Sequence, residues 1–95
     1  MTAAELAERL RALNIDIGAV CEPNEEEDGQ IVLSDTLYVQ VGPNYFNLVL
    51  NIPEGKLRYF YCRYRFNALL NDLRRLAQDP TLQDLALRQA LRRIP

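Results

Sequence analysis

The spacing of apolar and polar residues is helical near both ends of the chain and strand-like in between. Over residues 2–13, apolar side chains recur every three or four positions, which is typical of a helix that buries one face. Thr2-Ala3-Ala4-Glu5 forms a capping box, in which the Thr2 hydroxyl accepts from the Glu5 amide. The pattern therefore predicts an amphipathic N-terminal helix that stops near Asn14.

The central part of the chain alternates with a period of two. A short strand is expected at residues 15–21, and a longer strand at 30–41 with a break near Ser34 and Asp35. Gly42-Pro43-Asn44-Tyr45 is a turn signal, with Pro43 suited to the first central position. A two-residue loop at 43–44 makes all pairs on one face apolar, whereas a one-residue slip would mix the faces. The pairs on the apolar face are Val41 with Phe46, Val39 with Leu48 and Leu37 with Leu50; those on the other face are Gln40 with Asn47 and Tyr38 with Val49.

The next hairpin, around residues 52–56, leaves two registers open. A three-residue loop with a glycine bulge places Ile52 opposite Lys56, and a two-residue loop at 54–55 reverses the faces of the last strand. The first register is preferred because it buries the more apolar set and leaves Arg63 and Arg65 in water. It buries Phe60, Cys62 and Tyr64, exposes Leu57, Tyr59 and Tyr61, and turns Arg58 inward near the sheet end.

Helical spacing returns at Asn67, where the apolar stripe consists of Leu69, Leu70, Leu73, Leu76 and Ala77. Asp79 and Pro80 suit the start of a last helix, expected at residues 80–93. The apolar spacing changes from helical to a period of two and then returns to helical. This order predicts an α+β fold: an N-terminal helix, a three- to four-stranded antiparallel meander and two C-terminal helices. A chain of 95 residues has the size of one domain, so residues 1–95 are expected to form a single unit.

The chain lacks the residues on which most enzymes depend. It has no histidine, the commonest general base, and Ser34 is its only serine. It has no glycine-rich phosphate loop, and the acids at 25–28 lack the alternate spacing of a calcium loop. The sequence therefore predicts a protein that is not an enzyme and has no metal, cofactor or catalytic residues.

Cys21 and Cys62 are too few for a disulfide framework, and their apolar neighbours predict two small core residues. Residues 1–5 do not resemble a signal peptide, and no apolar run approaches the roughly 18 residues of a membrane span. A soluble cytoplasmic protein with no membrane partner is expected.

Charge divides the chain into two halves. Residues 1–55 carry ten acids and two bases, whereas residues 56–95 carry nine bases and three acids. Such a bipolar chain can attract its own other half, a second copy or a charged partner.

The outer face of the expected sheet is too aromatic for a face in water. Tyrosine and arginine are favoured at interface hot spots, so we predict a protein-interaction module such as an adaptor, client-binding chaperone or inhibitor-like protein. Its partner is expected to be another protein or a second copy in a homodimer. Two alternatives are that the final helix covers this face and that the register differs. The candidate interaction residues are Tyr38, Gln40, Asn47, Val49, Tyr59, Tyr61, Arg63 and Arg65.

The alternative function is binding of single-stranded nucleic acid or RNA, since tyrosines and arginines on a sheet can stack on bases. The order of elements resembles double-stranded RNA-binding domains, although residues 66–70 replace the lysine cluster of their last helix. A pI near 5.0 makes nucleic acid the less favoured partner. Residues 2–77 are also similar in element order to the first part of bacterial type III secretion chaperones, which implies a dimer. The second strand pair of that family is missing, because the chain from Asp79 onward is expected to be helical.

Overall fold

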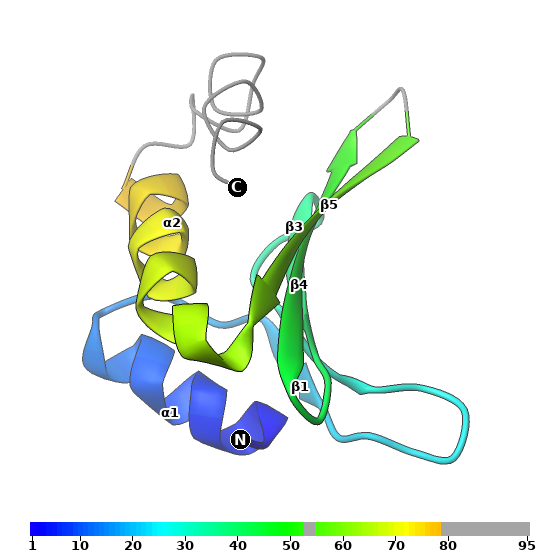
Figure 1. Ribbon diagram of the computed structural model, residues 1–95. Coiled ribbons are helices and arrows are strands. Elements are labelled where there is room, and N and C mark those ends of the chain that lie inside the picture. The colour runs from blue at the N-terminus through cyan, green and yellow to red at the C-terminus, as the bar shows by residue number, and fades with distance from the viewer. Residues whose placement is uncertain (53–54, 79–95) are drawn as a thin grey trace.

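The computed structural model describes residues 1–52 and 55–78, which form an antiparallel sheet with helices on one of its faces (Figure 1). The five strands follow one another in the order β1-β2-β3-β4-β5. The predicted α+β class and antiparallel meander are confirmed, but the sheet has five strands rather than three to four. The helix expected at 80–93 lies outside the described residues. The elements are α1 (Ala3–Ala12), β1 (Ala19–Cys21), β2 (Gly29–Val32), β3 (Leu37–Val41), β4 (Tyr45–Ile52), β5 (Gly55–Cys62), the 3-10 turn η1 (Arg63–Arg65) and α2 (Phe66–Gln78).

Helix α1 begins and ends where its sequence predicts. The Glu5 amide donates to the Thr2 hydroxyl at 3.1 Å, so the expected cap is present. After the helix, Asn14 adopts φ 60°, a left-handed conformation that asparagine tolerates better than most residues. The buried stripe of α1 packs on β1 and β2 and consists of Ala3, Leu6, Ala7 and Leu10.

The break expected near Ser34 and Asp35 is a turn that divides residues 29–41 into β2 and β3. The Leu37 amide donates to the Ser34 carbonyl, and the Ser34 amide donates to the Leu37 carbonyl, which closes this hairpin. The predicted pairing of β3 with β4 is confirmed at all five positions. The first strand is shorter than expected: Ile15 is buried, but pairing starts only at Ala19.

The preferred register of the last hairpin is wrong. Ile52 pairs with Gly55 rather than Lys56, a change of one residue that reverses both faces of β5. Tyr59 and Tyr61 therefore point to the helix side, opposite Leu48 and Phe46. The alternative, a two-residue loop at 54–55, predicted the correct faces. It would pair Leu48 with Tyr61, however, whereas Leu48 pairs with Tyr59, two residues earlier in the chain.

A buried hydrogen bond between β5 and α2 explains this register. The Tyr61 hydroxyl donates to Asp72 Oδ2, and both side chains are almost fully buried. Burial makes the largest contribution to the raised pKa of Tyr61, and the hydrogen bond to Asp72 raises it further, so the hydroxyl stays protonated. Arg58 faces outward in this register, which removes the cost of an arginine on the inner face.

The core lies between the inner face of the sheet and both helices. Leu69, Leu73 and Leu76 of α2 are fully buried, as the sequence predicts. The strands add Ile31, Leu37, Val39, Val41, Phe46, Leu48, Leu50 and Tyr61. Neither cysteine joins this core, contrary to expectation: Cys21 is exposed and Cys62 is half-buried. Pairing with Gln30 and Tyr45 puts both on the outer face.

Candidate functional site: the outer-face groove and the end pocket

A row of side-chain amides crosses the face of the sheet that α1 and α2 leave open. Gln30 pairs with Gln40, and Gln40 pairs with Asn47, so the three amides occupy adjacent strands at intervals of about 4.8 Å. All three side chains are half-buried. Within residues 1–52 and 55–78 none of the three amides has a hydrogen-bond partner. We call Gln30, Gln40 and Asn47 the amide row; each offers a carbonyl acceptor and two N–H donors to a ligand.

Tyr45 lies across the end of this face and holds the loop between β1 and β2. Its hydroxyl donates to Asp28 Oδ2 at 2.5 Å. The ring reaches that loop by lying over Gly42, where an added Cβ would come within 2.3 Å of the ring. The hydrogen bond to Asp28 raises the pKa of Tyr45, with smaller contributions from burial and from the Asp28 charge. Gly42 therefore leaves the space that Tyr45 needs to anchor the loop.

The anchored loop supplies an acidic rim. The side-chain oxygen of Asn24 accepts from the amides of Glu26 and Glu27 at 2.8 and 2.9 Å, which orders the loop locally. Lys56 and Arg58 on β5 form a basic rim at the other edge of the sheet. Between the two rims is a groove of about 510 Å³, the outer-face groove, with the amide row on its floor. Its lining residues are Glu26, Glu27, Asp28, Gln30, Tyr38, Gln40, Tyr45, Asn47, Lys56 and Arg58.

An exposed aromatic residue lies beside this groove on strand β5. Phe60 is 63% exposed, and its ring stacks on Tyr45 with centroids 5.8 Å apart. It pairs with Asn47, so its side chain lies next to the amide row, on the edge strand of the sheet. Among the described residues no strand pairs with the far side of β5. Large apolar side chains on an open edge are typical of surfaces that meet a partner.

The structure brings together only half of the predicted interaction residues. Gln40 and Asn47 lie in the amide row. Tyr38 and Val49 pair two residues further along the same two strands, on the same face, and are buried. The Lys56 ammonium lies 5.8 Å from the Tyr38 ring centroid, so Tyr38 has little exposed surface. The other four lie elsewhere: Tyr59 and Tyr61 face the helices, and Arg63 and Arg65 belong to η1.

Sequence reasoning missed five residues of this face: Gln30, Tyr45, Lys56, Arg58 and Phe60. The wrong register accounts for Arg58 and Phe60, which were placed on the inner face. Tyr45 was assigned to the turn, and its reach across Gly42 to Asp28 depends on three segments that meet only in the fold.

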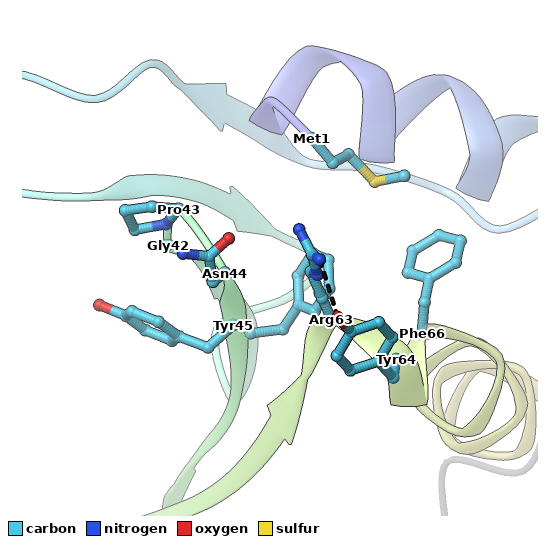
Figure 2. Close-up of a pocket in the computed structure, with 9 residues that line it drawn as sticks. Met1, Gly42, Pro43, Asn44, Tyr45, Arg63, Tyr64 and Phe66 are labelled. Carbon is cyan, nitrogen blue, oxygen red and sulfur yellow. Dashed lines mark hydrogen bonds between the residues drawn. The ribbon is translucent and has the colours of Figure 1, made fainter.

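A second cavity, the end pocket, opens where β3 turns into β4 (Figure 2). It has a volume of about 370 Å³, and Met1, Phe46 and Phe66 give it apolar walls. Phe66 contacts Phe46 at 5.6 Å between centroids, and the Arg9 guanidinium lies 5.7 Å from the Phe66 ring. Asn44 and Arg63 are among its polar lining residues. The pocket is lined by Met1, Gly42, Pro43, Asn44, Tyr45, Phe46, Arg63, Tyr64 and Phe66.

The described residues contain no cluster of three or more histidine, cysteine or acidic side chains placed to hold a metal ion. In the same part of the chain, no helix has the length and apolar character needed to cross a membrane. No protein-family model matches the sequence, and comparisons with curated proteins and with solved structures also yield no match.

Replacing Gly42 with alanine is expected to release Tyr45 from Asp28. The backbone permits alanine, because Gly42 has no positive φ, but the new methyl group would overlap the Tyr45 ring. With the hydrogen bond lost, the pKa of Tyr45 should fall toward the ordinary tyrosine value of about 10. An NMR titration of the tyrosine ring carbons measures this shift. Asp28→Ala is the matched control and should lower the same pKa; a Tyr45 pKa unchanged by Gly42→Ala would contradict the geometry.

Proposed function

We propose that this chain is a non-catalytic protein-interaction module that binds an extended segment of a partner protein in the outer-face groove. One observation carries the proposal: three adjacent half-buried amides, without hydrogen-bond partners in the described chain, lie between rims of opposite charge. A polypeptide backbone offers the donors and acceptors that such amides need. A segment with basic residues near Glu26 and acidic residues near Lys56 would complement both rims.

This geometry favours an inserted segment over the other two partners predicted from the sequence. In a face-to-face homodimer, two hollowed faces would leave their amide rows apart. A nucleic acid would bring its phosphates close to Glu26, Glu27 and Asp28, which repel them. Tyr59 and Tyr61, the rings expected to stack on bases, are on the helix side. The cytoplasmic location stays part of the proposal. It is supported by the two cysteines, which are both free, as is usual for thiols in the reducing cytosol.

The test is affinity capture from the native host, followed by mass spectrometry, with three forms of the full chain. Wild-type protein should retain one or a few proteins, and Lys56→Glu combined with Arg58→Glu should lose them, because the basic rim then repels acidic residues. Arg11→Glu and Arg74→Glu together make a matched control, since both arginines are exposed and lie on α1 and α2 rather than in the groove, and the ion pair of Arg11 with Glu8 is itself exposed and contributes little. The control should retain the same proteins.

Equal retention by the groove variant would contradict the proposal. Binding of an oligonucleotide at moderate salt would favour the nucleic-acid alternative instead. Turnover of a small molecule by the purified chain would show that it is an enzyme.

A further inference from the structure

The end pocket combines apolar walls with the guanidinium of Arg63. Arg63 is exposed, and its guanidinium donates to the Tyr64 hydroxyl at 2.8 Å and lies 4.8 Å from the Tyr64 ring centroid. Within residues 1–52 and 55–78 no acidic side chain lies within ion-pairing distance of Arg63. None of the residues that line the pocket is acidic. The pocket therefore has a net positive charge in a chain whose net charge is −2.

The surrounding backbone fixes the main chain of Arg63 beside the turn at Asn44. The Arg63 amide donates to the Asn44 carbonyl at 3.1 Å, which ties η1 to the turn between β3 and β4. Helix α2 begins at the pocket with Phe66, and its first turn contains no acidic residue. The positive end of the helix dipole therefore adds to the charge of Arg63.

Asn44 supplies a second polar contact on the same wall. Its side-chain amide is exposed, and the described chain gives it no hydrogen-bond partner. Figure 2 shows Asn44 and the Arg63 guanidinium on one side of the opening, with the side chains of Met1 and Phe66 opposite. A ligand whose anionic group pairs with Arg63 could thus donate an N–H to the Asn44 side-chain oxygen and place an apolar group in the same cavity.

We propose that the end pocket binds the free carboxyl terminus of a partner polypeptide whose last side chain is large and apolar. The terminal carboxylate pairs with Arg63, the last backbone N–H donates to the Asn44 side-chain oxygen, and the apolar side chain packs against Phe66. A fatty acid offers the carboxylate but no neighbouring N–H, so Asn44 favours the polypeptide. This inference rests on the proposed function, because it gives the protein partner a second point of contact.

The test uses fluorescent hexapeptide pools with five random positions and a fixed last residue, added to the purified full chain. Pools that end in leucine, phenylalanine or alanine are made as free acids and as carboxamides, and fluorescence anisotropy reports binding. The leucine and phenylalanine acids should bind at least about tenfold more tightly than their amides, because charged hydrogen bonds contribute this much. The alanine acids should bind more weakly than both, since alanine leaves the apolar walls in water.

Variants identify the groups responsible. Arg63→Gln should weaken the acids about tenfold and remove the difference between acid and amide, whereas Arg63→Lys should keep part of it. Asn44→Asp should also weaken the acids, because it places a carboxylate beside the ligand. Arg74→Gln is the matched control, an exposed arginine on α2 that does not line the pocket, and it should change nothing.

Equal binding of acids and amides, or no binding of either, would overturn the inference. Binding of sodium octanoate that requires Arg63, together with no binding of peptide acids, would also overturn it and assign the pocket to fatty acids. These outcomes are separate from failure of the proposed function, which is tested at Lys56 and Arg58 in the outer-face groove. Capture that depends on that groove, without any preference for peptide acids, would leave the function standing and remove only this inference.

Discussion

Tyr61→Glu is expected to unfold the protein. Tyr61 is only 2% exposed, and its hydroxyl donates to the buried Asp72 carboxylate. Glutamate would place a second carboxylate next to Asp72 and remove the donor that Asp72 needs. Leaving a buried carboxylate without its donor costs about 1–3 kcal/mol or more, and burying a second, unpaired carboxylate costs several kcal/mol further. Together these are a large part of the roughly 5–15 kcal/mol by which a small domain is stable. Circular dichroism should show no cooperative thermal transition between about 25 and 90 °C, a range that includes the melting temperatures of ordinary domains.

The adjacent residue provides the matched control for this substitution. Phe60 is 63% exposed and faces the opposite side of the sheet, where its ring stacks on Tyr45. Phe60→Glu should therefore keep the fold and change the free energy of unfolding by about 1 kcal/mol or less. The opposite result, with Tyr61→Glu folded and Phe60→Glu unfolded, would mean that β5 has the register first expected from the sequence.

Leu73→Ala is expected to give the second large effect. Leu73 is fully buried in α2 and belongs to the core that joins this helix to the sheet. Truncation of a buried leucine removes apolar contacts and leaves a cavity, at a cost of about 2–5 kcal/mol. For a domain of this size, the melting temperature should fall by roughly 10–30 °C.

Arg74→Ala at the next position tests whether burial is the cause. Arg74 is exposed, so its truncation should change stability by no more than about 0.5 kcal/mol. Equal melting temperatures for Leu73→Ala and Arg74→Ala would contradict the packing of α2 on the sheet. Differential scanning calorimetry of both variants measures the difference directly.

Local sequence signals predicted the elements that depend on near neighbours. The capping box at Thr2 and the left-handed Asn14 bound α1, and both act within a few residues. The hairpin of β3 and β4 was predictable in register, because a one-residue slip would have mixed Leu48 or Phe46 with the polar side chains of Gln40 and Asn47, and the Pro43-Asn44 turn sets the loop length.

The candidate site was predictable only where it lies on that hairpin. Gln40 and Asn47 were found because the β3–β4 pairing puts them side by side. The contact of Tyr45 with Asp28 over Gly42 was not predictable, because Tyr45 and Asp28 are 17 residues apart and the need for a glycine at 42 arises only when the ring lies on it. The end pocket was missed for the same reason, since the N-terminus, a turn and η1 form it together.

The sequence by itself determined the order of the elements, the register of the β3–β4 hairpin and the buried stripe of α2. Each of these follows from periodicity and from capping or turn residues that act over short distances. Only the tertiary structure decided which face of β5 is buried. Tyr59 and Tyr61 alternate with Phe60 and Cys62, so both faces of the strand are similarly apolar and the local pattern does not distinguish them. Asp72 makes the distinction from α2, because a buried carboxylate needs a hydrogen-bond donor and the Tyr61 hydroxyl reaches it only when that face turns inward.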